Sequence, residues 1–81
     1  MRPTKVQREI LAFLVMGEDI EEDCYDYGGP CVGQHRHFPW RTFSILKDRQ
    51  WIRATGIGPQ GGVWTITNAG KRALAGVRDD P

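Results

Sequence analysis

The cysteines and histidines of this chain gather in one short segment and could bind a metal ion. They follow the spacing Cys-x6-Cys-x3-His-x-His, at Cys24, Cys31, His35 and His37. Zinc takes four nitrogen or sulfur ligands in a tetrahedron, and binding it contributes folding free energy to a small domain. The usual Cys-x2-Cys pair is missing, and two histidines separated by one residue point to opposite sides of an extended strand. A zinc site through these four residues is therefore one interpretation, and zinc is the one cofactor that the sequence suggests.

The same segment allows two other states of the cysteines. Buried free cysteines pack as small hydrophobic side chains, and exposed histidines then need no metal. A disulfide between Cys24 and Cys31 is the state least expected in a reducing cytoplasm. Catalysis by a cysteine would need a histidine base and a third orienting group, and no third group stands at a spacing that a known family uses. We therefore expect no enzyme activity.

Length and composition indicate one small domain spanning residues 1–81. A chain of 81 residues buries only about 60% of its unfolded surface, so its core must be small. Its 40% hydrophobic and 26% charged residues are those of an ordinary globular chain. The sequence has neither an apolar run long enough to span a bilayer nor a signal peptide. We expect a cytoplasmic protein that does not bind membranes.

The net charge of +1 hides an uneven distribution. Six acidic residues lie between Glu18 and Asp26, which we call the acidic run, whereas residues 36–78 hold eight lysines and arginines against Asp48 alone. A basic half of this kind is typical of proteins that bind nucleic acid, although solvated faces of either sign are common in small domains. The acidic run is either such a solvated face or a surface that binds a protein or mimics DNA.

Two amphipathic helices are expected, over residues 5–16 and 39–50. Thr4 can cap the first, and Gly17 suits its C-terminal end. In the second helix one side is apolar and the opposite side is polar. Phe43, Leu46 and Gln50 fall together on one side, and the opposite side carries Arg41, Ser44 and Asp48, with Ile45 at its edge.

A hairpin and a third helix are expected after residue 50. Residues 51–55 and 63–67 are predicted to be strands joined by a glycine-rich loop at 56–62, and residues 69–76 a helix. Trp51 and Trp64 are expected in the core across the hairpin, and Trp40 is expected to be partly exposed. Residues 18–37 are predicted to be irregular, either a hairpin or a short helix plus loop, because Gly28-Gly29-Pro30 forces a turn and argues against one continuous helix. The fold class is therefore α+β.

Two phrases in this part of the chain resemble the winged-helix repressors of the MarR-like and PadR-like groups. They read Phe43-x-x-Leu46-Lys47-Asp48-Arg49-Gln50-Trp51-Ile52 and Trp64-x-Ile66-Thr67-x-x-Gly70-x-x-x-Leu74. In that family, the recognition helix ends in Leu-x-x-x-Gly-Leu-Ile, and the second strand of the wing runs into Leu-Thr-x-x-Gly. Here Gln50 stands at the position of the glycine, the wing tip carries no lysine or arginine, and residues 18–37 replace the usual second helix.

The resemblance implies a small winged-helix domain with three helices and a β-hairpin wing. The helix at 39–50 would enter the major groove of double-stranded DNA, with the wing beside it. The residues carried over as DNA contacts are Arg36, His37, Arg41, Ser44, Lys47, Arg53 and Gln60. The implied function is that of a non-catalytic transcriptional or accessory regulator of bacterial or phage type, and such domains usually bind as homodimers. The alternative is a protein–protein interaction module of phage or mobile-element type that uses the same scaffold and the acidic run.

Overall fold

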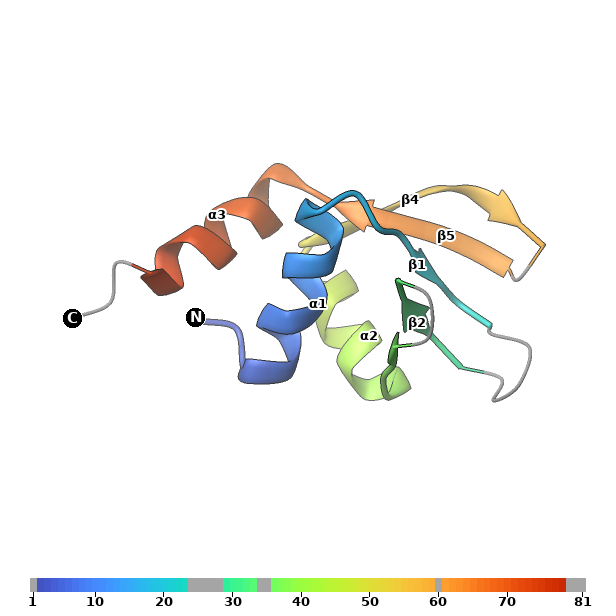
Figure 1. Ribbon diagram of the computed structural model, residues 1–81, viewed down its shortest axis with the longest axis horizontal. Coiled ribbons are helices and arrows are strands. Elements are labelled where there is room, and N and C mark those ends of the chain that lie inside the picture. The colour runs from blue at the N-terminus through green and yellow to red at the C-terminus, as the bar shows by residue number, and fades with distance from the viewer. Residues whose placement is uncertain (1, 24–28, 34–35, 60, 79–81) are drawn as a thin grey trace.

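The computed structural model describes residues 2–23, 29–33, 36–59 and 61–78 of the chain. Within these residues the fold is α+β, with three helices and five strands (Figure 1). In chain order the elements are α1 (Lys5–Val15), β1 (Ile20–Glu21), β2 (Cys31–Val32), β3 (Arg36–His37), α2 (Trp40–Asp48), β4 (Ile52–Gly58), β5 (Gly61–Ile66) and α3 (Asn68–Arg78). The helices and the hairpin therefore form where the sequence predicted them, to within a few residues at their ends.

Helix α1 begins with a capping box and is followed by a glycine in the left-handed conformation. The Thr4 side chain accepts a hydrogen bond from the Gln7 backbone N–H, and the Gln7 side chain accepts one from the Thr4 N–H. This exchange satisfies two of the N–H groups that a helix start leaves without partners. Gly17 follows the helix with a φ of +101°, a conformation that favours glycine. One face of α1 enters the core through Ile10, Leu11 and Leu14.

The five strands form one antiparallel sheet in the order β3-β2-β1-β5-β4. Strand β1 is its centre, because Ile20 lies opposite both Val32 of β2 and Trp64 of β5. Residues 18–37 thus contribute three short strands, and their described part follows the hairpin alternative. The loop predicted at 56–62 was too long: the ladder runs on to the pair Gly58 and Gly61, with a register shift between Ala54 and Gly56. Glycine and proline content suggested a flexible loop, but cross-strand pairing extends the strands.

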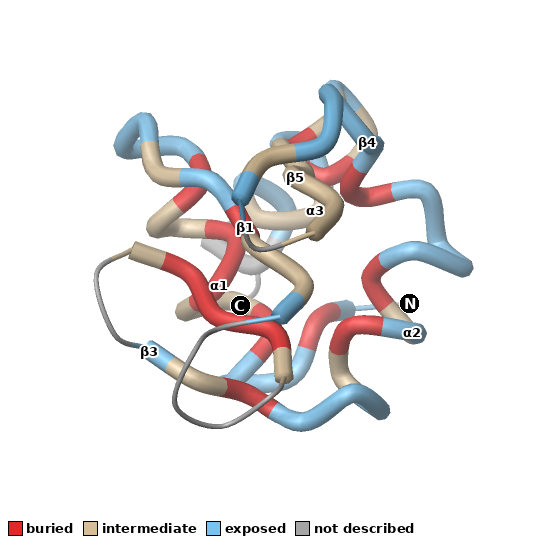
Figure 2. Tube along the Cα trace, turned by 90° about the vertical axis from the view of Figure 1, so that its right-hand side faces the viewer, coloured by how far each residue is buried: buried red, intermediate tan, exposed pale blue. Residues whose placement is uncertain are grey.

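The core lies between the helices and one face of the sheet. Its buried hydrophobic cluster draws on α1, α2, the strands and the segments that join them (Figure 2). Its members are Ile10, Leu11, Leu14, Ile20, Val32, Phe38, Phe43, Leu46, Trp51, Ile52 and Ile66. The β4–β5 hairpin extends away from α3 toward the opposite end of the molecule, which measures 41 × 22 × 20 Å (Figure 1). In the part of the chain that is described, no helix has the length and apolar character needed to cross a membrane.

Hydrogen bonds of Thr67 and a close backbone approach at Gly70 connect the start of α3 to the turn that follows α2. The Thr67 N–H donates to the carbonyl oxygen of Trp51 at 2.9 Å, and the Thr67 hydroxyl donates to the carbonyl oxygen of Gln50 at 2.6 Å. The same hydroxyl accepts the Gly70 N–H at 3.0 Å. A side chain at position 70 would overlap the Trp51 carbonyl oxygen, so glycine is needed for this approach. The Thr-x-x-Gly phrase is therefore a structural junction.

Candidate nucleic-acid interface

Helix α2 has one face in the core and the opposite face in solvent. Phe43 and Leu46 are buried, whereas Arg41, Ser44 and Asp48 are exposed. Ile45, at the edge of that face, is half-buried. The two-sided helix predicted from the sequence is confirmed, and its nine residues span about 13 Å. This length suits a helix that enters the major groove of DNA, which is about 12 Å wide.

Aromatic packing fixes the position of α2 against the sheet. The ring of Phe43 contacts that of Trp40 edge to face, with centroids 5.6 Å apart, and that of Trp64 in the same way at 5.2 Å. Lys47 places its ammonium group 5.9 Å from the centroid of the Phe43 ring while its side chain stays exposed. Trp40 is 48% exposed, Trp51 is buried and Trp64 is half-buried. Edge-to-face contacts of Phe43 with Trp40 and Trp64 therefore hold α2 in one place against the sheet.

Arg53 lies on the other side of the sheet from α2. Its neighbour Ile52 is buried, and successive side chains of a strand point to opposite faces. Arg53 and its cross-strand partner Thr65 consequently face away from the core. The structure therefore does not group Arg53 with the exposed face of α2.

Arg36 and His37 belong to β3 and take part in the packing of the β2–β3 hairpin. Arg36 Nη2 lies 2.7 Å from Glu9 Oε2 on α1, and both side chains are about 40% exposed. His37 is half-buried, and its Cα partner across the strand pair is Cys31. An ion pair this exposed contributes little stability. It does, however, pair the guanidinium of Arg36, which the sequence analysis predicts to contact DNA, with Glu9.

The structure limits the predicted zinc site. Cys31 is disulfide-bonded, contrary to the expectation for a cytoplasmic protein, and Cys24 and His35 lie outside the described residues. A disulfide sulfur is not the thiolate that zinc requires, so four-residue zinc binding would belong to the reduced chain. Among the residues that are described, no three histidine, cysteine, aspartate or glutamate side chains are placed to hold a metal ion.

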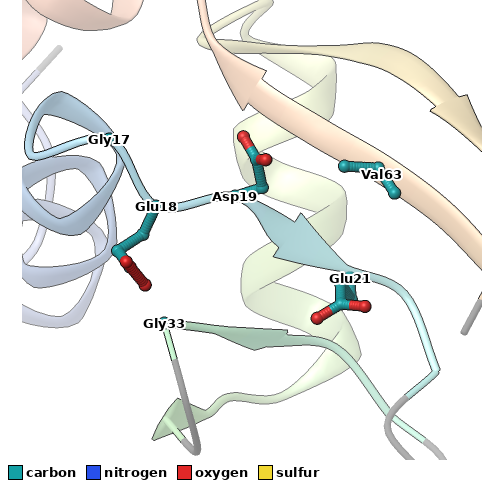
Figure 3. Close-up of a pocket in the computed structure, with 6 residues that line it drawn as sticks. All are labelled: Gly17, Glu18, Asp19, Glu21, Gly33 and Val63. Carbon is teal, nitrogen blue, oxygen red and sulfur yellow. The ribbon is translucent and has the colours of Figure 1, made fainter. Parts of the chain in front are cut away.

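Part of the acidic run lines an open pocket beside the sheet. The pocket is bounded by Gly17, Glu18, Asp19, Glu21, Gly33 and Val63. Figure 3 shows the carboxylates pointing in different directions, that of Glu18 toward Gly33 and that of Asp19 away from it. Since the three carboxylates do not converge on one point, the pocket lacks the arrangement that a bound cation needs.

Glu22 makes a contact with Trp64 that the sequence analysis does not predict. Its Oε1 accepts a hydrogen bond from the indole N–H of Trp64 at 2.6 Å, and its own N–H donates to the Gly62 carbonyl oxygen at 3.0 Å. Ile20 is buried, so the alternation of a strand puts Glu22 on the same face of the sheet as Ile20 and Trp64. The pattern Ile20-Glu21-Glu22 indicates this placement only once residues 20–22 are known to be extended, because the acidic run by itself suggests a charged surface.

The predicted contact residues therefore divide into two groups. Arg41, Ser44 and Lys47 lie together on α2, and the remaining described ones lie on β3 and β4. Gln60 is outside the described residues.

Compared with protein-family models, with curated proteins and with solved structures, the chain shows no significant match.

Proposed function

We propose that this chain is a winged-helix protein that binds double-stranded DNA without catalysis, as a transcriptional or accessory regulator. One observation carries the proposal. Helix α2 buries Phe43 and Leu46 against the core and leaves Arg41, Ser44 and Lys47 exposed to solvent. A helix of this kind is the usual means by which small domains read base edges. Such a regulator would work in a cytoplasm, where bacterial or phage DNA is found and where the disulfide at Cys31 would be exposed to reduction.

The arrangement around α2 supports the winged-helix part of the proposal. Strands β1, β5 and β4 are neighbours in that order, and the β4–β5 hairpin follows α2 directly, as a wing follows a recognition helix. Gln50, which stands at the usual glycine position of the family, has a φ of +60°. This is the left-handed conformation that glycine adopts most easily. The β2–β3 hairpin takes the place of the usual second helix.

The exposed face of α2 offers side chains that distinguish base pairs. Arginine can donate two hydrogen bonds to guanine, aspartate accepts from the amino group of cytosine, and serine can serve either partner. In this mechanism Arg41 and Ser44 meet base edges, with Asp48 one turn further along the helix. Lys47, at the side of the helix, contacts a phosphate and fixes the register.

The proposal is tested by reversing one charge on α2 and one on the far face of the sheet. Arg41→Glu should weaken binding of a fluorescent random-sequence duplex by roughly tenfold or more at low salt. Arg53→Glu makes the same change in net charge away from α2, and it should have a clearly smaller effect. If the two variants bind alike, or if Arg41→Glu binds as well as the unchanged protein, the assignment of α2 to the groove is wrong.

The acidic side of the sheet favours a second candidate, a protein-interaction module. Glu18, Asp19 and Glu21 form an acidic rim around the open pocket beside β1, where their charge would repel DNA and attract a basic partner. This candidate predicts no duplex binding at low salt by folded protein. Its surface would then be mapped by charge reversal of these three residues.

A further inference from the structure

Glu22 links the β4–β5 hairpin to the face of the molecule that carries α2. Its carboxylate is held by the Trp64 indole at 2.6 Å, and the Trp64 ring packs on Phe43 with centroids 5.2 Å apart. Phe43 in turn contacts Trp40, the first residue of α2. The Glu22 carboxylate thus lies beside the aromatic cluster on which the start of α2 packs, next to the base of the hairpin strand β5.

Glycine at position 62 makes room for this charge. A Cβ atom there would overlap the Glu22 carboxylate and lie 3.1 Å from the Trp64 indole nitrogen. The next acid, Asp23, is exposed, and its Cβ lies 3.8 Å from the Cβ that a side chain at Gly61 would have. Glu22 and Asp23 therefore flank the end of the hairpin on the β5 side.

The hairpin end has no cation to offset these acids. Residues 56–66 contain no lysine or arginine, so the hairpin itself offers a phosphate no positive side chain. In a wing that binds DNA, positive side chains would be expected at this position, because phosphate contacts supply most of the affinity.

We propose that Glu22 is a selectivity residue that repels phosphates on the hairpin side and so restricts DNA binding to the exposed face of α2. The inference rests on the proposed function. Its consequence is a lower affinity for any DNA sequence, while base contacts through Arg41 and Ser44 are unaffected. Binding of the duplex would then depend more on contacts to base edges than on general attraction to phosphates.

Glu22→Gln separates this role from a purely structural one. Glutamine keeps a side-chain oxygen that can accept the Trp64 indole N–H, but it carries no charge. If Glu22 only positions Trp64, the variant should bind DNA as the unchanged protein does. If the charge matters, the variant should bind random-sequence duplex about twofold to fourfold more tightly at low salt. The gain should shrink at physiological salt, where the Debye length is about 8 Å.

Glu18→Gln is the matched control, because it removes the same charge at the other end of β1, beside Gly33. Intrinsic tryptophan fluorescence and the melting temperature report whether Trp64 keeps its packing in each variant. Should Glu22→Gln fail to fold, Asp23→Asn takes its place, since Asp23 is exposed on the same flank. Tighter binding by the Glu22 or Asp23 variant than by Glu18→Gln supports the inference.

Equal binding by the Glu22 variant and the Glu18 control overturns the inference. In that case, the Arg41→Glu variant shows whether only the role of Glu22 is wrong or whether the assignment of α2 to the groove is wrong as well. If Arg41→Glu still weakens binding, the groove assignment stands and only the role of Glu22 is wrong. If the unchanged protein binds no duplex at low salt, the proposed function fails as well, and the inference fails with it.

Discussion

At the scale of single residues, Gln50 adopts a backbone conformation that glycine would adopt more easily. A non-glycine residue in the left-handed region costs about 1–2 kcal/mol relative to the ordinary helical conformation. Gln50 has a φ of +60°, and its carbonyl oxygen accepts the Thr67 hydroxyl. The surrounding hydrogen bonds therefore impose the angle, since the side chain is exposed and makes no demand of its own.

Glycine at this position should stabilise the fold. Gln50→Gly removes the cost of the left-handed conformation in the folded state. Glycine also makes the unfolded chain more flexible, and this offsets about 0.5–1 kcal/mol of the gain. We expect a net gain of up to about 1 kcal/mol in the free energy of unfolding, measured by urea denaturation. Gln50→Ala keeps a Cβ atom in the same conformation and should show no gain. A loss of stability in Gln50→Gly would contradict the structural account of this turn.

At the scale of elements, hydrogen bonds and a close backbone approach constrain the junction between the α2 turn and α3. The hydroxyl of Thr67 bridges Gln50 and Gly70, and the Trp51 carbonyl oxygen occupies the space beside Gly70. Alanine fits poorly there because the obstacle is backbone, which cannot move aside as the end of a side chain can.

Gly70→Ala should destabilise the protein by more than about 2 kcal/mol through this overlap. Gly76→Ala is the control within the same helix, since nothing lies within 4 Å of the Cβ that it would add. That substitution should stabilise α3 by up to about 1 kcal/mol, because alanine is the better helix former. Thermal or urea unfolding of the two variants measures the contrast, and a Gly70→Ala protein of unchanged stability would refute the proposed junction.

The three helices and the β4–β5 hairpin could be predicted because local patterns determine them. Thr4 caps α1, Phe43 and Leu46 recur on one side of α2, and glycines mark the hairpin. Strands β1, β2 and β3 have two residues each, too few for any periodic signal. They exist because β1 pairs with β5, which is more than forty residues away.

The candidate site was predictable only in part for the same reason. Helical periodicity placed Arg41 and Ser44 on an exposed face, and the structure confirms that face. It could not show that Arg36 pairs with Glu9 on α1, a contact between residues 27 apart. Nor could it bring Glu22 to Trp64, because that contact depends on the pairing of β1 with β5.

At the scale of the whole molecule, opposite charges are divided between two surfaces. The acids of residues 18–23 line the open pocket beside β1 and flank the hairpin end, whereas α2 presents Arg41 and Lys47 to solvent. A net charge near zero thus conceals a surface that can attract phosphates at one place and repel them at another. We expect DNA affinity to be modest and dominated by the few cations near α2.

The most direct test of the central claim is a titration of fluorescent random-sequence duplex with the unchanged protein, at low salt and at physiological salt. The account predicts saturable binding that weakens steeply as salt rises, with a slope equivalent to a few phosphates neutralised. Circular dichroism of the same sample establishes that the protein is folded. Absence of binding at low salt by folded protein would contradict the DNA-binding account and direct attention to the acidic rim of β1.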